Sequence, residues 1–314
     1  MADGYKDIEK LETDLWEAAD NLRANSKLTS SDYFMPVLGV IFLRHAANRF
    51  EAAHQQIEQD QADGKMPKRK VLPADYISRR SLYLPESARF GWIMEKAATT
   101  DLPTLVTGAM NAIEGAFEPL LGVLPKDYGI FEPKVLEDLM RLFNSEQIKR
   151  ATGDVFGRIY EYFLAKFSIQ KAHDNGEFFT PSSLVQTIVN VIEPDHGIVL
   201  DPACGSGGMF VQSSHFIEHE GGDTAKKVVF YGQEKNRDTI RIAKMNLAVH
   251  GLEGKIAEAI TYYQDEHTLV GKCDFVMANP PFNVDLVDAE STARHITTHS
   301  ISKPKRSSLE ARCR

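Results

Sequence analysis

One segment of the sequence, IVLDPACGSGGMF, joins a hydrophobic run to a carboxylate and a glycine-rich turn. The run ends at Asp201, and the turn contains Pro202, Cys204, Gly205, Ser206, Gly207 and Gly208. A glycine turn at the carboxyl end of a strand lets the backbone approach a ligand where a Cβ atom would not be tolerated. The segment lacks the third glycine of the dinucleotide fingerprint, and Asp201 would repel a pyrophosphate. We therefore predict a site for a cationic nucleoside that bears an amino acid; the alternative is a simple tight turn.

A second acidic residue, Glu234, ends the next β-branched run, VVFYGQE. An acid at the tip of the second strand of such a sheet is placed to bind both hydroxyls of a ribose. The alternative is an isolated acid in a loop. Because Glu234 follows the glycine turn at a suitable interval, we interpret it as the ribose-binding residue.

A third motif, Asn279-Pro280-Pro281-Phe282, follows the run CDFVMANP. The Asn279 side-chain oxygen can accept a hydrogen bond from an amino group. The prolines leave the carbonyl groups that precede them without a hydrogen-bond partner in a neighbouring strand. Phe282 offers a face on which a planar ring can stack. These groups are suited to hold an exocyclic amine with its lone pair toward an electrophile, unless the motif is only a turn.

These motifs lie in a part of the chain where short strands alternate with helices. We predict strands at residues 198–203, 228–234, 255–260 and 273–280, and helices near 182–192, 207–220 and 237–250. Helices of that length between strands indicate right-handed crossovers and a parallel sheet. We expect the strand order 3-2-1-4.

The amino-terminal part of the chain has the three- and four-residue periodicity of helices, which predicts a helical bundle. The first helix carries its apolar face on Ile8, Leu11, Leu15, Trp16, Ala19 and Leu22. A second is expected to begin after the capping residues Ser30 and Ser31 and to run to about Gln59. Further helical periodicity covers residues 102–117, 135–143 and 155–167, and residues 60–73 are predicted to form an exposed basic loop.

The overall composition restricts what the protein can bind and where it can work. The chain has 314 residues and a net charge of −8, so contact with a nucleic acid needs a local basic patch or a basic partner. Its three cysteines are too few for a disulfide framework or a zinc cluster, and we expect no metal and a reducing cytoplasm. The most apolar stretch, residues 34–42, is too short to span a bilayer, and no signal sequence precedes it.

Together the motifs resemble those of a known family. DPACGSGG, YGQE and NPPF, in that order, resemble motifs of S-adenosylmethionine-dependent methyltransferases that modify adenine at N6, and GEFFTPSSLV at 176–185 resembles the motif that closes over the cofactor. LETDLWEAADNLRAN, VLGVIFLRHAANRFE and VFGRIYEYFLAKF resemble the amino-terminal domain of the modification (M) subunit of type I restriction-modification systems. The resemblance implies a helical domain at 1–170, a partial Rossmann-like methyltransferase domain with a parallel sheet at 171–289, and an atypical polar basic tail at 290–314.

The resemblance also implies roles for individual residues. S-adenosylmethionine is the implied cofactor, and the residues implied to bind it are Glu177, Phe178, Phe179, Thr180, Pro181, Ser182, Asp201, Pro202, Cys204, Gly205, Ser206, Gly207, Gly208 and Glu234. In the motif Asn279-Pro280-Pro281-Phe282, the residues Asn279 and Pro280 would accept hydrogen bonds from the adenine N6 amine. Phe282 would stack on the base. The target atom is inaccessible inside a duplex, so the base must be flipped out.

The implied function is methylation of adenine in double-stranded DNA, with the target chosen by a separate specificity subunit. The implied partners are that specificity (S) subunit, a restriction (R) subunit and a second M subunit. Binding to a membrane is not expected. Two alternatives are a non-catalytic cofactor-binding or assembly module and a protein-glutamine methyltransferase, although the latter usually carry NPPY.

The sequence departs from the family pattern at two places. Where relatives end the third strand in an Asp near the adenine of the cofactor, this chain has Ile260, with Glu258 or Asp265 as possible substitutes. The family sheet has more strands than the four counted here, and residues 291–314 are too polar to supply them. We interpret the end as premature, through a frameshift near Glu290; a native short variant with a solvated tail is the alternative. We expect such a chain to methylate no DNA even with a specificity subunit present, to bind S-adenosylmethionine weakly or not at all, and to self-associate through the edge of the fourth strand.

Overall fold

The computed structural model describes residues 2–151, 153–175 and 180–280. It consists of two compact units, Met1–Pro181 with Lys244–Leu252 and Ser182–Ala243 with Glu253–Arg314. The predicted domain boundary at 170/171 falls within a helix that continues to Asn175. That boundary stays a prediction.

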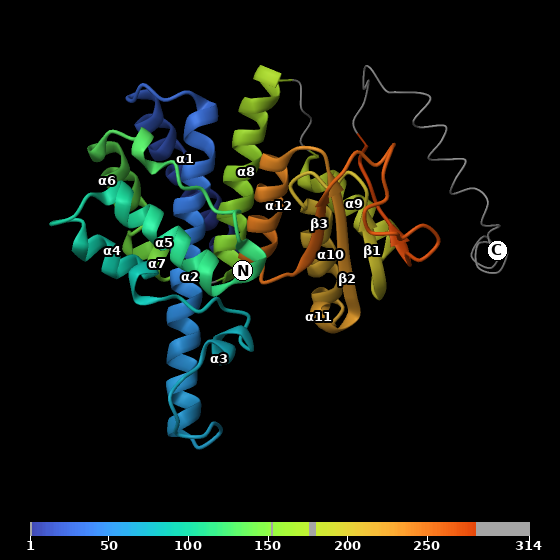
Figure 1. Cartoon of the computed structure of the whole chain (residues 1–314), viewed down its shortest axis with the longest axis horizontal. Coiled ribbons are helices and arrows are strands. Elements are labelled where there is room, and N and C mark those ends of the chain that lie inside the picture. The colour runs from blue at the N-terminus through green and yellow to red at the C-terminus, as the bar shows by residue number, and fades with distance from the viewer. Residues whose placement is uncertain (1, 152, 176–179, 281–314) are drawn as a thin grey trace. The chain divides into compact units, whose positions relative to one another are not determined.

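The first unit is helical, as predicted (Figure 1). Its helices are α1 (Ala2–Ala24), α2 (Ser30–Ala62), α3 (Pro73–Ile77), α4 (Phe90–Lys96), α5 (Leu102–Ala116), α6 (Pro133–Leu142), α7 (Glu146–Lys149) and α8 (Gly153–Asn175), with 3-10 turns at Glu86–Ala88, Glu118–Leu120 and Tyr128–Ile130. The periodicity did not reveal α3, α4 and α7, because helices of one or two turns show too few repeats of the pattern. None of the described helices combines the length and the apolar character that crossing a membrane requires.

The N-cap of helix α2 lies one residue before the predicted capping residues. Thr29, and not Ser30 or Ser31, is the N-cap: its side chain accepts from the Asp32 amide, and the Asp32 carboxylate accepts from the Thr29 amide. This reciprocal pair is a capping box, which satisfies two amide groups that the first turn leaves without helical partners. The prediction was wrong because three consecutive residues, Thr29, Ser30 and Ser31, can all cap, and only the backbone conformation selects one of them.

The core of the first unit is an aromatic cluster where α8 packs against α1 and α2. Phe163 is fully buried, and its ring centroid lies 5.4 Å from that of Trp16 and 5.7 Å from that of Phe143, both in edge-to-face geometry. Phe167 continues the cluster, 4.9 Å from Trp16 and 5.0 Å from Phe34. These contacts explain the aromatic residues that recur along the predicted helix at 155–167.

The second unit is an α/β domain with a parallel sheet. Its strands are β1 (Gly197–Asp201), β2 (Val228–Glu234), β3 (Gly254–Glu258) and β4 (Phe275–Val276), and its helices are α9 (Ser182–Ile192), α10 (Gly208–His219), α11 (Thr224–Lys227) and α12 (Arg237–Val249), the last of which ends in the first unit. The sheet order β3-β2-β1-β4 is the one expected from the sequence. Strand β4 is shorter than predicted, since the chain pairs with β1 only as far as Met277, whose amide donates to the Leu200 carbonyl.

We predict that Phe163→Ala destabilises the first unit by about 3–5 kcal/mol, because it leaves a cavity within the aromatic cluster. The measurement is urea denaturation followed by tryptophan fluorescence, since Trp16 contacts Phe163 directly. The matched control is Ile169→Ala on the same helix, whose side chain is 55% exposed. An equal loss of stability in the two variants would contradict the proposed core.

Candidate functional site

The carboxyl ends of three neighbouring strands bring the predicted motifs of the second unit to one edge of the sheet. Asp201 at the end of β1 pairs in register with Gly232 of β2, and β2 continues to Glu234. On the other side of β1, β4 runs parallel and leads into Asn279. In open parallel sheets, ligands bind at this edge. The tertiary structure therefore brings together residues from all three motifs.

The glycine-rich turn has a backbone that only glycine adopts readily. Gly205 and Gly207 have φ values of +51° and +77°, and Gly207 is the left-handed N-cap of α10. The Gly207 amide donates to the Cys204 carbonyl at 2.8 Å, which closes the turn. A Cβ atom added at Gly205 would meet no described atom within 4 Å. The turn thus borders open space into which any larger side chain at residue 205 would project.

The turn packs closely against strand β2. The Cys204 amide donates to the Gln233 carbonyl at 3.0 Å, and a Cβ atom at Gly232 would lie 2.8 Å from the Cys204 sulfur. Gly232 is therefore required at this position, and the sequence analysis missed it. A glycine inside a β-branched strand was the available signal, because it marks a close approach of another backbone.

Asp201 is a buried carboxylate at the centre of this edge. Its side chain is 2% exposed, and one oxygen accepts from the Ala203 amide at 3.0 Å. Burial raises the pKa of Asp201 to about 7, and the negative charge of Glu234 contributes to the rise. A cation that entered the site would favour the ionised form, so the site is electrostatically suited to a positively charged ligand.

Cys204 has a structural role in this arrangement. Burial, together with the charges of Asp201 and Glu234, raises the pKa of its thiol. The thiol therefore stays neutral, whereas a nucleophile or a metal ligand would need the thiolate. Its contribution is to fill the space between the turn and Gly232.

Glu234 is held at the end of β2. One of its carboxylate oxygens accepts from the Asn236 amide at 2.9 Å, and its carbonyl accepts from the Ala259 amide at 3.0 Å. The side chain is only partly buried. A fixed and accessible carboxylate of this kind can accept hydrogen bonds from two neighbouring hydroxyl groups.

Gln233, which the sequence analysis did not select, fixes the loop at residues 261–267 beside the turn. Its amide nitrogen donates to the Thr261 hydroxyl at 2.8 Å and to the Gln264 carbonyl at 3.2 Å, and its oxygen accepts from the Glu266 amide at 2.9 Å. Thr261 in turn donates to the Pro202 carbonyl. The buried side chain of Gln233 thereby links β2, the loop and the turn.

The acids considered for the third strand already have partners in the chain. Glu258 at the end of β3 accepts from Arg237 at 2.6 Å. Asp265 accepts from the Leu269 and Val270 amides at 2.9 and 3.2 Å. Ile260 is 42% exposed. The contact with the adenine of a cofactor stays unassigned.

Several predicted site residues cannot be placed with the others. Glu177, Phe178, Phe179, Pro281 and Phe282 lie outside the described residues. Thr180 and Pro181 belong to the first unit, whereas Ser182 begins α9 in the second. The roles assigned to all of these residues stay predictions.

Comparisons with known proteins match both parts of the chain. The family model described as N-6 DNA Methylase matches residues 151–308, and the one described as HsdM N-terminal domain matches residues 11–143. The MjaIX methylase subunit, a type I restriction enzyme subunit of Methanocaldococcus jannaschii, is 35% identical over 91% of this chain and 53% of its own length. The HindI methylase subunit of Haemophilus influenzae is 38% identical over 57% of this chain and 43% of its own length. The chain thus spans about half the length of the curated relatives it matches.

Solved structures share the fold. The methyltransferase subunit of a type I restriction-modification system from Streptococcus thermophilus aligns with a TM-score of 0.67 at 20% identity, over 87% of this chain and 63% of that one. A modification subunit of a type I restriction enzyme from Vibrio vulnificus aligns with a TM-score of 0.58 at 19% identity, over 87% of this chain and 60% of that one. At these identities the alignments support the architecture alone.

We predict that Asp201→Asn makes the stability of the protein less dependent on pH. The folded-state pKa of about 7 lies above the usual value of 3.8, so the wild-type carboxyl favours folding below pH 4 and loses this contribution as the pH rises to about 7. The variant should therefore gain stability relative to wild type by roughly 1.4 kcal/mol per pH unit over this window. The measurement is urea denaturation followed by circular dichroism at pH 5 and pH 7, and an equal difference at both pH values would contradict the assignment.

Proposed function

The chain belongs to the N-6 DNA methylase family, in its type I restriction-modification branch, and from this premise we propose that it transfers a methyl group from S-adenosylmethionine to the N6 amine of adenine in DNA. The observation that carries the proposal is the common edge of the sheet at which Asp201, Glu234 and the segment before Asn279 emerge from neighbouring strands. That order supports the proposal, because a region suited to a cationic nucleoside would lie next to one suited to an exocyclic amine.

The residues of the glycine turn fit the proposed cofactor. The open space beside Gly205 would receive the ligand, and the buried carboxyl of Asp201 would face its positive charge. Glu234 would accept from the ribose hydroxyls, while Gln233 keeps the loop at 261–267 in place beside the turn. When bound, S-adenosylmethionine supplies the methyl group that the reaction transfers.

Asn279 would orient the target amine. Its side-chain oxygen and the carbonyl before Pro281 would accept the hydrogens of the adenine N6 group and direct the nitrogen lone pair toward the methyl group. Phe282 would stack on the flipped base. No general base is needed early, because the proposed catalysis depends mainly on holding the two reacting groups in line.

The proposed function includes partner proteins. A specificity subunit would choose the DNA site, and a second M subunit and a restriction subunit would complete the assembly. Because the chain spans about half the length of its relatives, these partners are inferred from the family alone. We place this activity in the cytoplasm, where bacterial and archaeal DNA lies.

We predict that Gly205→Val abolishes binding of S-adenosylmethionine, measured by isothermal titration calorimetry. A valine there would be strained at φ +51° and would project into the space assigned to the ligand. The matched control is Gly221→Val, which has a similar strain at φ +75° and open surroundings but lies after the other end of α10. Equal affinity in the two variants would refute the cofactor site.

We predict that Asn279→Ala, in a version of the chain extended to the length of its relatives and assembled with its specificity subunit, lowers methyl transfer by orders of magnitude and leaves cofactor affinity nearly unchanged. The substitution removes a contact that is made with the reacting amine and not with the cofactor. The measurement is incorporation of labelled methyl groups into unmethylated host DNA, with Asn190→Ala on the exposed surface of α9 as the control. Methyl transfer at the wild-type rate by the Asn279 variant would mean that NPPF is only a turn. Cofactor binding without any methyl transfer by the wild-type assembly would favour a non-catalytic module.

A further inference from the structure

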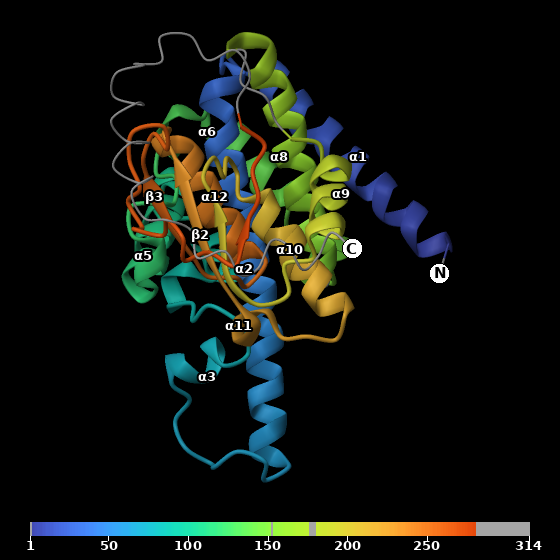
Figure 2. The same cartoon turned by 90° about the vertical axis from the view of Figure 1, so that its right-hand side faces the viewer.

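The end of helix α2 and the residues that follow it form a projection on the first unit. In both views the carboxyl-terminal part of α2 extends beyond the other helices of this unit, with α3 beside it (Figures 1 and 2). Residues 63–72, here named the α2–α3 loop, connect the two helices. All residues of this loop are exposed except Met66 and Val71, which are half-buried, so the loop has no buried core of its own.

This projection is positively charged in a chain whose net charge is −8. Residues 60–80 carry three acidic side chains, Asp60, Asp63 and Asp75, against six basic ones. The basic residues are Lys65, Lys68, Arg69, Lys70, Arg79 and Arg80. The local excess of positive charge is the kind of patch that a polyanion requires on an acidic protein.

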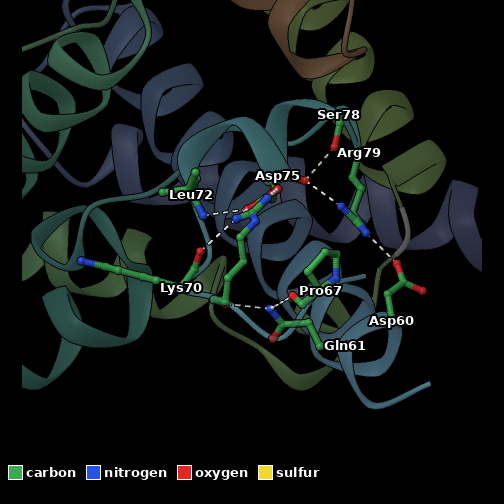
Figure 3. Close-up of polar contacts among 9 residues, drawn as sticks. Asp60, Gln61, Pro67, Lys70, Leu72, Asp75, Ser78 and Arg79 are labelled. Atoms are coloured by element: carbon green, nitrogen blue, oxygen red, sulfur yellow. Dashed lines mark hydrogen bonds and ion pairs between the residues drawn. The ribbon is translucent and has the colours of Figure 1, made fainter. Parts of the chain in front are cut away.

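An ion pair between Arg69 and Asp75 fixes the carboxyl-terminal end of the loop. The two guanidinium nitrogens donate to the two carboxylate oxygens at 2.9 and 2.7 Å, and the Leu72 amide donates to the same carboxylate at 2.7 Å (Figure 3). The hydrogen bonds from Arg69 hold the pKa of Asp75 below its usual value. At neutral pH the Asp75 carboxylate is therefore ionised, and both of its oxygens accept hydrogen bonds.

A second set of contacts ties the loop to the end of α2. Arg79 donates to the Asp60 carboxylate at 2.6 Å and to the Asp75 carbonyl at 2.9 Å. The Gln61 side chain donates to the Pro67 and Arg69 carbonyls at 3.2 and 2.8 Å (Figure 3). The Gln61 bonds thus tie the loop to α2, and Arg79, which follows α3, ties α3 to the same helix.

The aromatic ring of Tyr76 anchors α3 itself. It stacks on Phe50 of α2 with ring centroids 4.7 Å apart and an interplanar angle of 9°, and its hydroxyl lies 2.8 Å from Nδ1 of His54. Tyr76 is 3% exposed. The loop is thus held by ion pairs, backbone hydrogen bonds and a buried ring, which reduces the entropy that it would lose on binding.

These contacts pair every carboxylate of the projection, and Lys68 and Lys70 are not among the partners. Asp63 pairs with Lys65 at 3.0 Å, as Asp60 and Asp75 do with arginines. No carboxylate in the described part of the chain pairs with the ammonium groups of Lys68 and Lys70, which are exposed. Figure 3 shows the Lys70 side chain extending away from the polar network.

We propose that the α2–α3 loop contacts backbone phosphates of double-stranded DNA through Lys68 and Lys70. The inference rests on the proposed function, which makes DNA the substrate. Phosphates fit better than an acidic protein, because Arg69 and Arg79 already pair with Asp75 and Asp60, whereas Lys68 and Lys70 are lysines, which protein interfaces disfavour. Lysine suits phosphate as a mobile point charge that needs no fixed geometry.

The test is fluorescence anisotropy of a labelled DNA duplex with the full chain over a range of salt concentrations. Each phosphate contact contributes about 0.9 to the slope of log affinity against log salt, so Lys68→Ala with Lys70→Ala should reduce the slope by about 1.8. The affinity at low salt should fall by about tenfold. Replacement of both residues by arginine should preserve the slope.

The matched control is Lys27→Ala with Lys134→Ala, which removes two exposed lysines from elsewhere on the first unit. An equal change of slope in the two alanine pairs would overturn the proposal, because net charge alone would then explain it. The proposal would also be overturned if the full chain did not bind the duplex, or if the loop variants lost binding to the specificity subunit and kept DNA binding.

Calorimetry with S-adenosylmethionine separates this inference from the proposed function. The loop variants should bind the cofactor like wild type, because the glycine turn belongs to the other unit. A wild-type chain that bound DNA with the expected slope but failed to bind the cofactor would refute the proposed function and leave the phosphate contact standing.

Discussion

The close approach of the glycine turn to strand β2 is the contact on which the candidate site depends. Only a hydrogen atom fits at Gly232, since a Cβ atom there would lie 2.8 Å from the Cys204 sulfur. This contact lets the Cys204 amide reach the Gln233 carbonyl and places the turn at the end of β1. The Gln233 side chain then holds the loop at residues 261–267 beside it. A shift of the turn away from β2 would disturb the surroundings of Asp201 and Glu234 together.

The electrostatic character of the site follows from this packing. The turn and strands bury Asp201, and burial raises its pKa to about 7. Ionising the buried Asp201 carboxyl is costly when no cation is beside it. An incoming cation lowers that cost, so the burial of Asp201 favours a positively charged ligand. Glu234, which is only partly buried, keeps its carboxylate accessible beside it.

The two units differ in which of their charged side chains have ion-pair partners. In the second unit, the carboxyl of Asp201 accepts from the Ala203 amide and forms no ion pair with a cation of the described residues, which leaves its negative charge for a ligand. In the projection formed by the end of α2, the α2–α3 loop and α3, cations neutralise Asp60, Asp63 and Asp75, and positive charge is left over at Lys68 and Lys70. Local pairing, and not the net charge of −8, therefore decides which ligand each surface can attract.

The sequence by itself determined the features that depend on short-range patterns: the helical first part, the alternation of strands and helices that indicates a parallel sheet, and the glycine turn between Asp201 and α10. Periodicity and glycine placement report these directly, because they are properties of neighbouring residues. The tertiary structure decided what depends on residues distant in the chain. Gln233 acquires its role only when residues 261–266 reach it, and Asp60 pairs with Arg79 only because α3 packs against α2. No local pattern encodes such partners, since each is selected by the packing of the whole unit.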